Sequence, residues 1–296
     1  MSAAPSGHPP KLRTFHHSAY PAERIAADRR QSVSVCLPAR ECAGTVGEIV
    51  TVLLSLAEQG VLDEVVVVDA ASRDGTAAVA ERAGALVLQE AELLPSYGPV
   101  LGKGDAMWRA LSILSGEVVC FLDADTEAFS GHFATGLLGA LLCEPGLSLV
   151  KGFYRRPLAA SGEPGGEGGG RVNHLMARPA LSIFYPELSS VRQPLAGEVA
   201  ARRELLMSLP FATGYGVEIA MLIDAWRAVG LDRIAQVDLD EHRNRHQSLA
   251  ALSPMARTVL ATIARRLEQD GRLQGAHAPV EGAPIERPAL ALAGVV

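Results

Sequence analysis

The stretch Glu117-Val-Val-Cys-Phe-Leu-Asp-Ala-Asp125 decides the fold, because a short and almost wholly apolar run ends here in two carboxylates. A second run of the same form is Glu64–Asp69, with the sequence EVVVVD. Such runs of β-branched residues are typical of strands that are buried on both faces, as in a parallel sheet. Ligands of these sheets bind beyond the carboxyl ends of the strands, where both runs place aspartates.

Strand and helix patterns alternate around these two runs. Further strands are predicted at 32–37, 85–89 and 147–154, and helices at 45–59, 74–83, 103–114 and 131–142. This alternation predicts an α/β fold with a Rossmann-like, mainly parallel sheet and helices on both faces.

The composition changes after residue 157. Residues 161–170 hold six glycines in ten positions and are expected to form a loop. Helices are predicted at 171–184, 199–208, 215–229 and 249–268, with a strand at 234–239. We therefore divide the chain into an N-terminal extension (1–30), a nucleotide-binding half (31–157), a second half (158–270) and a mobile tail (271–296).

Charge and cysteine content exclude several classes of protein. The 296 residues carry a formal charge of −6, which argues against broad phosphate neutralisation and hence against a nucleic-acid-binding protein. The four cysteines show no zinc-ligand spacing and are expected to be free thiols. Neither a signal peptide nor a membrane-spanning run is visible, so we expect a cytoplasmic protein.

Asp123 and Asp125 form the sharpest local signal. Residues i and i+2 at a strand end point the same way, and two carboxylates so close repel each other unless a cation lies between or beside them. Mg²⁺ or Mn²⁺ bridging substrate phosphates would remove that repulsion. The alternative is an acidic turn that caps the next helix.

Other candidates are less specific. Asp69 is placed near a nucleotide base or ribose, with a helix cap as the alternative, and Lys103 opens a helix within Gly-Lys-Gly, which suits phosphate weakly. Glu218 stands in an otherwise apolar helix and must be partnered or functional. Gly168 to Arg171 form either an anion site or a flexible linker, and His242 is a metal-capable imidazole beside an arginine-rich run.

Several motifs, taken in order, resemble one family. They are LPAREC, VVVDAASRDGT, GKGDAMWR, FLDAD, VKGFYRRPL, GGGRVNHLMARP, QPLAGE, LPFATGYGVEI and HRNR, within residues 32–260. The chain resembles the glucosyl-3-phosphoglycerate synthases, which are retaining GT-A glycosyltransferases related to mannosyl-3-phosphoglycerate synthases. The resemblance implies a GT-A fold with a C-terminal acceptor-binding part, a Mg²⁺ or Mn²⁺ cofactor, and a homodimer.

The resemblance also implies roles for individual residues. Asp125 and His242 would hold the metal, with Asp125 and Glu218 at the catalytic centre. The donor, a nucleotide sugar with UDP-glucose favoured, would contact Pro38, Ala39, Glu41, Asp69, Lys103, Asp123, Ala124, Asp125, Leu195, Gly197 and Glu218. The acceptor, 3-phosphoglycerate, would contact Gly170, Arg171, Asn173, Arg243 and Asn244.

The chain departs from the family motifs at Cys42, Ala70, Ala124 and Asn173. These positions lie on the expected nucleotide and acceptor contacts and leave three readings open. One is a glucosyl transferase, the second is a mannosyl transferase that uses GDP-mannose, and the third is a non-catalytic nucleotide-sugar-binding relative. A sugar nucleotidyltransferase is disfavoured, because LPARECAG is a poor version of its glycine- and arginine-rich loop. We expect attack on the same face as the leaving phosphate.

Overall fold

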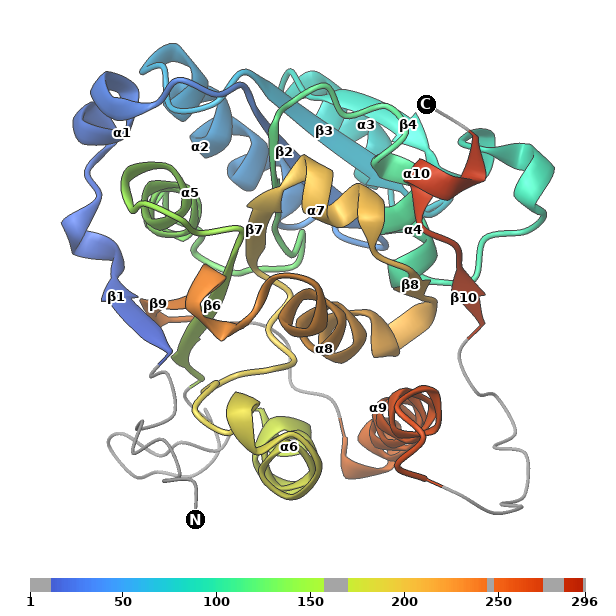
Figure 1. The fold of residues 1–296 in the computed structure, drawn as a ribbon. Coiled ribbons are helices and arrows are strands. Elements are labelled where there is room, and N and C mark those ends of the chain that lie inside the picture. The colour runs from blue at the N-terminus through green and yellow to red at the C-terminus, as the bar shows by residue number, and fades with distance from the viewer. Residues whose placement is uncertain (1–11, 157–169, 244–247, 274–284, 295–296) are drawn as a thin grey trace.

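The computed structural model describes residues 12–156, 170–243, 248–273 and 285–294. Within them, one eight-stranded sheet has the order β1-β9-β6-β7-β5-β2-β3-β4 (Figure 1). In chain order its strands are β1 (Arg13–His16), β2 (Val33–Ala39), β3 (Glu64–Asp69), β4 (Leu86–Gln89), β5 (Val118–Phe121), β6 (Leu149–Arg155), β7 (Val199–Arg202) and β9 (Ile234–Glu241). A separate two-stranded sheet pairs β8 (Phe211–Ala212) with β10 (Glu286–Arg287).

The sheet is mainly parallel, as predicted. Only β7 runs against its neighbours β5 and β6. The chain passes from β2 outward to β3 and β4, and then returns to place β5 on the other side of β2. The strand order reverses between β2 and β5, and such a reversal opens a crevice at the carboxyl ends of the strands.

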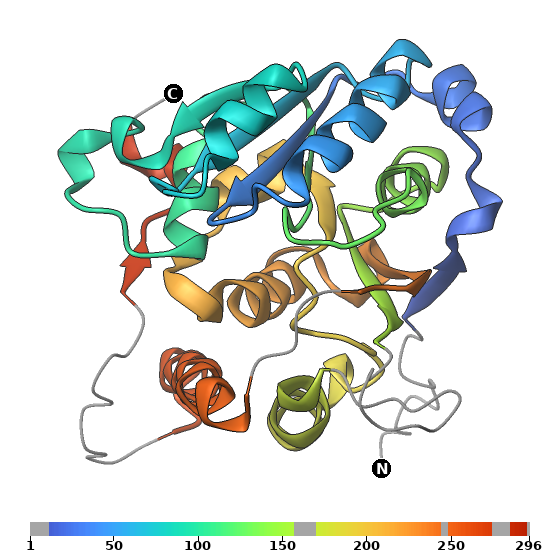
Figure 2. The ribbon, with the colours of Figure 1, turned by 180° about the vertical axis from the view of Figure 1, so that it is seen from behind.

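Helices cover both faces of the sheet, as the views from opposite sides show (Figures 1 and 2). They are α1 (Ala22–Asp28), α2 (Val46–Glu58), α3 (Thr76–Arg82), α4 (Lys103–Ala110), α5 (His132–Cys143), α6 (Arg178–Phe184), α7 (Arg203–Ser208), α8 (Val217–Val229), α9 (Leu249–Gln269) and α10 (Leu290–Ala293). A π-helical turn, Asn173–Ala177, precedes α6. No described helix is both long and apolar enough to cross a bilayer.

Strand β3 shows how one run of valines serves two cores. Val65 and Val67 belong to the core cluster that includes residues of α1, α2, α3 and α5, whereas Val66 and Val68 belong to the cluster that includes residues of α4, α6, α8 and α9. Successive strand residues point to opposite faces, so a continuous apolar run is needed where both faces are covered.

The predicted helix at 199–208 is wrong in its first part. Residues Val199–Arg202 form β7, and only Arg203–Ser208 are helical. The sequence VAAR favours a helix locally, but insertion between β5 and β6 gives its backbone strand partners and buries Val199, Ala200 and Ala201. Tertiary pairing overrides local propensity here.

Both ends of the chain contribute to the fold. β1, from the predicted N-terminal extension, pairs in parallel with β9. Within the predicted mobile tail, β10 pairs with β8, Arg287 is buried against Asp105, and Leu290 is 1% exposed. Residues 285–294 are thus packed, contrary to the expectation, because Arg287 and Leu290 find partners that the local composition does not reveal.

The division of the chain into two halves stays a prediction, since β6, β7 and β9 share one sheet with β2, β3 and β5.

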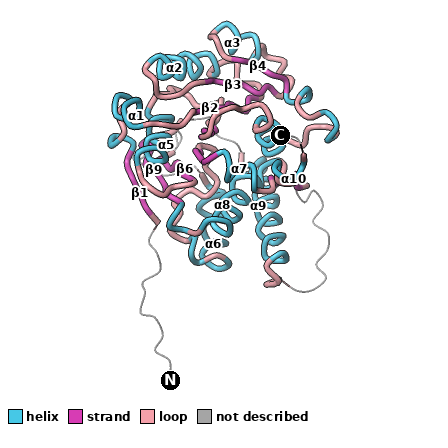
Figure 3. Tube along the Cα trace, turned by 45° about the horizontal axis from the view of Figure 1, so that its top comes forward, coloured by secondary structure: helices cyan, strands magenta, loops and turns pink. Residues whose placement is uncertain are grey.

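Helix α6 lies side by side with α9, and α9 with α8, on one face of the molecule (Figure 3). Arg266 of α9 is fully buried, and its Nε donates to Asp224 of α8 at 2.8 Å. A buried ion pair of this kind fixes the register of the two helices.

We expect Gly139→Ala to destabilise the protein. A Cβ at Gly139 would overlap the Cβ and Cγ atoms of Tyr20, so α5 could no longer pack closely on the N-terminal segment. Such overpacking lowers the free energy of unfolding by about 1–3 kcal/mol. The control is Gly131→Ala at the start of the same helix, where a Cβ meets Leu56 at an ordinary 3.5 Å. Equal urea midpoints for the two variants would contradict this packing.

Candidate active site

A cleft of about 510 Å³ opens at the carboxyl ends of β2 and β5, where the strand order reverses. Its walls come from the end of β2, the turn after β3, the start of α4 and the segment after β5. Six of the predicted donor residues line it: Pro38, Ala39, Lys103, Asp123, Ala124 and Asp125. The structure therefore brings the core of the predicted donor site together.

Lys103 is the cation at the centre of this cleft. Its Nζ lies 2.5 Å from Oδ1 of Asp123 and 3.0 Å from Oε1 of Glu218. Burial opposes the charge on the amine, but the two carboxylates outweigh burial and raise the pKa of Lys103 well above its usual value. Glu218 is thus partnered through Oε1, whereas its Oε2 is buried without a hydrogen-bond partner among the described residues.

Gly197 allows the loop before β7 to approach Asp123 closely. A Cβ at this position would overlap the carboxylate of Asp123, so only glycine leaves that side chain in place. The same loop is held by Asn173, whose Oδ1 accepts from the backbone N–H of Leu195 at 3.0 Å. Gly197 therefore borders the carboxylate of Asp123, and Leu195 lies two residues before it in the same loop.

Asp125 and His242 come from segments that the fold joins. The N–H of Glu127 donates to the carbonyl of Arg243 at 2.8 Å, which ties the chain after Asp125 to the chain after β9. Desolvation in the cleft raises the pKa of Asp125, Asp123 raises it further, and Lys103 and His242 act in the opposite direction. Among the described residues, Asp125 has no ion-pair partner, so a cation would relieve its repulsion from Asp123.

The hydrogen bonds of His242 indicate which ring nitrogen is free. Thr126 Oγ1 donates to the carbonyl of Asp123 at 3.3 Å and lies 3.0 Å from Nε2 of His242. Because that hydroxyl has one proton, it accepts from Nε2–H, and the lone pair of the neutral imidazole is then on Nδ1. Nδ1 is buried with no partner among the described atoms. A metal ion fits this donor, and the site suits a divalent cation bound by Asp125 and His242.

Glu198 and Tyr154 support His242 from behind. Oε1 of Glu198 lies 3.2 Å from Nε2 of His242, and the Tyr154 ring stacks on the imidazole with 4.4 Å between centroids. The Tyr154 hydroxyl donates to Oε2 of Glu198 at 2.8 Å and accepts from Arg156 at 2.9 Å. Burial alone would raise the pKa of Glu198, but His242 and Arg156 outweigh it and lower that pKa. Sequence reasoning missed Glu198, although QPLAGE contains it.

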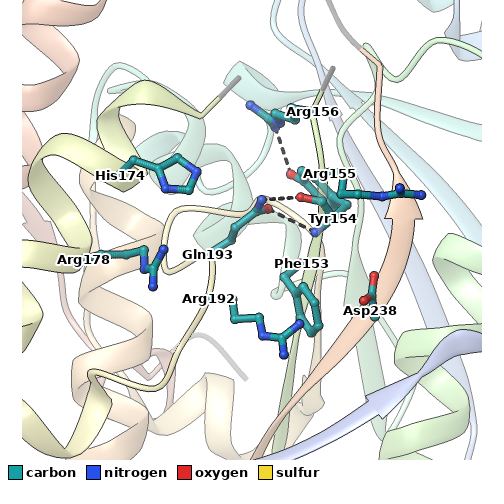
Figure 4. Close-up of a pocket in the computed structure, with 9 residues that line it drawn as sticks. All are labelled: Phe153, Tyr154, Arg155, Arg156, His174, Arg178, Arg192, Gln193 and Asp238. Carbon is teal, nitrogen blue, oxygen red and sulfur yellow. Dashed lines mark hydrogen bonds between the residues drawn. The ribbon is translucent and has the colours of Figure 1, made fainter. Parts of the chain in front are cut away.

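Tyr154 also lines a second cavity of about 410 Å³ (Figure 4). It is lined by Phe153, Tyr154, Arg155, Arg156, His174, Arg178, Arg192, Gln193 and Asp238. The guanidinium of Arg192 lies over the ring of Phe153, 4.5 Å from its centroid. Four arginines around one cavity favour a ligand with phosphate or carboxylate groups.

The predicted acceptor residues have different places. Gly170 adopts φ +71° and accepts from His174 N–H at 3.1 Å, which starts the helix that carries His174 and Arg178 into the second cavity. Asn173 holds Leu195 instead of lining that cavity. Arg243 is exposed and pairs with Glu241 at 2.6 Å, and Asn244 lies outside the described residues. Neither Arg171 nor Arg243 lines the cavity.

The sequence analysis did not single out three arginines that line this cavity: Arg155, Arg156 and Arg192. The motif VKGFYRRPL contains the first two.

Five predicted donor residues lie outside the cleft lining: Glu41, Asp69, Leu195, Gly197 and Glu218. Asp69 is 1% exposed, and its Oδ2 accepts from Ser72 N–H and from Gln89, so it holds the turn after β3. Glu41 adopts φ +54°, and its Oε1 accepts from Arg73 N–H at 2.9 Å. Glu90, which no motif indicated, does line the cleft, and burial raises its pKa to about 7.

Lys151 is a further buried cation that sequence reasoning missed. Its Nζ donates to the carbonyl of Ala196 at 2.6 Å, which supports the loop that carries Gly197. Burial lowers the pKa of Lys151 to about 8, with Glu218 and Glu198 acting in the opposite direction.

The sequence of this chain is similar to those of known glycosyltransferases. The model of "Glycosyl transferase family 2" matches residues 34–151. The glucosyl-3-phosphoglycerate synthase of Mycolicibacterium smegmatis is 46% identical over 245 residues, which cover 83% of this chain and 80% of that relative.

Two solved structures are similar over nearly their whole length. The mannosyl-3-phosphoglycerate synthase of Rubrobacter xylanophilus is 42% identical with a TM-score of 0.88, covering 95% of this chain and 97% of that one. The Mycobacterium tuberculosis glucosyl-3-phosphoglycerate synthase, solved with Mn²⁺, UDP-glucose and phosphoglyceric acid, is 39% identical with a TM-score of 0.80, covering 95% and 99%. The family resemblance and the expected GT-A fold are confirmed. This chain belongs to the glucosyl-3-phosphoglycerate synthase family of glycosyltransferases.

Proposed function

We propose that this protein transfers glucose from UDP-glucose to 3-phosphoglycerate with a divalent metal ion. One chain of contacts carries the proposal: Tyr154 lines the arginine-lined cavity and stacks on His242, and His242 acts electrostatically on Asp125, which lines the carboxylate-rich cleft. A sugar donor in the cleft and an anionic acceptor in the cavity would then lie on neighbouring residues. The family membership supports the same reaction.

The donor occupies the cleft in this proposal. Pro38 and Ala39 border the base, Lys103 and Asp123 lie toward the diphosphate and ribose, and Oε2 of Glu218 accepts from a hydroxyl of the sugar. Asp125 and Nδ1 of His242 hold Mg²⁺ or Mn²⁺, which supplies charge neutralisation at the diphosphate leaving group. Asp69 and Glu41 support this site by shaping the turns behind it.

The acceptor occupies the arginine-lined cavity in this proposal. Arg178 and Arg192 point into it from the helix after Gly170 and from the loop before β7 (Figure 4). A phosphate and a carboxylate each suit a guanidinium fork, so both ends of a phosphoglycerate find partners. Arg171, Arg243 and Asn244 stay proposed acceptor contacts.

The transfer conserves atoms in one step. The bond between the sugar C1 and the diphosphate oxygen breaks, and the acceptor hydroxyl oxygen bonds to C1 on the same face. The hydroxyl proton passes to the leaving diphosphate. In this proposal the protein holds the donor and the acceptor in the reacting geometry and excludes water. Transfer between the two bound substrates is then effectively unimolecular. Asp125 and Glu218 are the residues that we place at the reacting centre.

We further propose a cytoplasmic homodimer. The four cysteines are free thiols, three of them buried, which fits a reducing compartment. Leu175 and Ile183 are 76% and 69% exposed on the segment that carries α6, and a second copy would cover them.

A donor panel tests the reaction. Purified protein with Mg²⁺, 3-phosphoglycerate and UDP-glucose is expected to release UDP only when the acceptor is present, with a glucosyl product visible by mass spectrometry. GDP-mannose is the necessary second donor, because the Rubrobacter xylanophilus neighbour is a mannosyl synthase. Faster turnover with GDP-mannose would show that the protein transfers mannose and not glucose. If neither donor releases its nucleotide in an acceptor-dependent way, the proposed transfer to 3-phosphoglycerate is contradicted.

Metal binding should depend on Asp125 directly and on Glu198 indirectly. Asp125→Ala removes a proposed ligand and should abolish turnover, whereas Glu198→Gln should weaken Mn²⁺ binding by about 10–100-fold, as is common for partners of a metal-bound histidine. Initial rates measure the turnover of Asp125→Ala, and titration of Mn²⁺ by EPR measures the affinity of both variants. Glu187→Gln, on the surface after α6, is the matched control. Unchanged Mn²⁺ affinity in Glu198→Gln would exclude its positioning role.

Arg178→Ala should weaken the acceptor and not the donor. Loss of a charge-assisted hydrogen bond costs about 1.5–3 kcal/mol, so the KM for 3-phosphoglycerate should rise by about 10-fold or more. Arg82→Ala, an exposed arginine on α3, removes the same charge away from the cavity. Initial rates at varied concentrations of acceptor and of donor give both KM values for each variant. Equal acceptor KM values in Arg178→Ala and Arg82→Ala would show that the acceptor does not bind in the arginine-lined cavity.

A further inference from the structure

Three side chains outside the cleft form a second group with the chemistry of metal ligands. His16 ends β1, His17 begins the 3-10 helix His17–Ala19, and Asp240 lies near the end of β9. Their ligand atoms all lie within 4.8 Å of one another. Nε2 of His17 is 2.7 Å from Oδ2 of Asp240, and Nε2 of His16 is 3.4 Å from Oδ1.

The convergence depends on how two segments end. Adjacent residues of a strand point to opposite faces, but β1 stops at His16 and the chain turns, so the rings of His16 and His17 lie 4.5 Å apart between centroids. Asp240 adopts φ +61°, and its N–H donates to Oδ1 of Asp238 at 3.0 Å. Because β1 pairs in parallel with β9, the carboxyl ends of both strands lie at the same end of the sheet.

We propose that His16, His17 and Asp240 bind a divalent transition metal ion, with Zn²⁺ as the best fit. In a tetrahedral site with bonds of about 2.0–2.1 Å, neighbouring ligand atoms are about 3.3 Å apart. The present separations therefore need only small side-chain rotations. Two imidazole nitrogens and one carboxylate favour zinc over magnesium, and a water completes the fourth position.

The surroundings accept a cation at this place. Nδ1 of His16 lies 2.8 Å from Oγ of Ser18 and accepts from the N–H of Ser18 at 3.2 Å. Metal binding through Nε2 therefore requires the Nδ1–H tautomer, whose proton Oγ of Ser18 can accept. The ring of His132 lies 4.4 Å from that of His17, and Nε2 of His132 lies 3.0 Å from the carbonyl oxygen of Leu239. His17 is 18% exposed, while His16 and Asp240 are about half exposed, so solvent reaches the ion.

Such a site would link the N-terminal strand to the body of the protein. β1 lies at the sheet edge and pairs only with β9 among the described strands. A metal ion bound across both strands would hold that edge in place and raise the thermal stability. The site is separate from the cleft that holds Asp125, and the inference does not rest on the proposed transferase reaction.

Cobalt titration tests the site. Four-coordinate Co²⁺ with nitrogen ligands absorbs visible light strongly, whereas six-coordinate Co²⁺ in an oxygen-rich site absorbs weakly. We use metal-free protein that carries Asp125→Ala, so that the cleft loses a proposed ligand. One equivalent of Co²⁺ should produce the intense band, and Zn²⁺ should displace it and raise the melting temperature.

The ligand variants decide the outcome. In the same background, His17→Gln and Asp240→Asn should lose the band and the Zn²⁺-dependent rise in melting temperature, and the half-exposed His16→Gln should weaken both. His174→Gln, from the arginine-lined cavity, is the matched control and should keep them. Absence of the intense band before substitution, or its persistence in His16→Gln and His17→Gln, would overturn the proposal.

Discussion

Repulsion among carboxylates is the constraint on which this structure depends. Four carboxylates gather at the carboxyl end of the sheet: Asp123, Asp125, Glu198 and Glu218. Asp123 and Glu198 raise the pKa of Asp125, and all but Asp125 stabilise the charge of the nearby lysines Lys103 or Lys151. Lys103 compensates Asp123 and Glu218, while Tyr154, Arg156 and His242 compensate Glu198. Within the described residues, Asp125 is left without an ion pair, and its pKa is raised. The protein has thus assembled a negative site that a divalent cation completes.

One network connects the arginine-lined cavity to His242. Arg156 contacts the Tyr154 hydroxyl, Tyr154 contacts Glu198, and Glu198 lies against His242. Tyr154 and Arg156 also line the arginine-rich cavity, so a bound anion there would meet the residues that support the metal ligand. In the proposed function, acceptor binding and metal binding would therefore share this set of side chains.

The sequence predicted what depends on local pattern. The runs EVVVVD and EVVCFLDAD predicted buried parallel strands, and the position of Asp123 and Asp125 beyond β5 followed from strand geometry. β7 was missed because a four-residue strand of Val, Ala and Arg gains its stability from two neighbouring strands. The packed tail was missed because Arg287 finds Asp105 across 182 residues of chain.

The same distinction holds for the site. Single motifs led to Lys103, Asp125 and His242, since each carries its chemistry in its own residue type. Glu198, Lys151 and Arg192 were not found, because their roles arise from partners on other strands and loops. Asn173 has the expected type but holds the Leu195 loop, a contact that no local pattern indicates.

Pulsed EPR of the protein with Mn²⁺ and UDP tests the central claim most directly. If Asp125 and Nδ1 of His242 bind the cation beside the nucleotide, the spectrum will show nitrogen hyperfine coupling from a coordinated imidazole together with phosphorus coupling from UDP. His242→Gln will remove the nitrogen coupling, whereas His132→Gln will retain it. A Mn²⁺–UDP complex without nitrogen coupling in the unsubstituted protein would contradict the account.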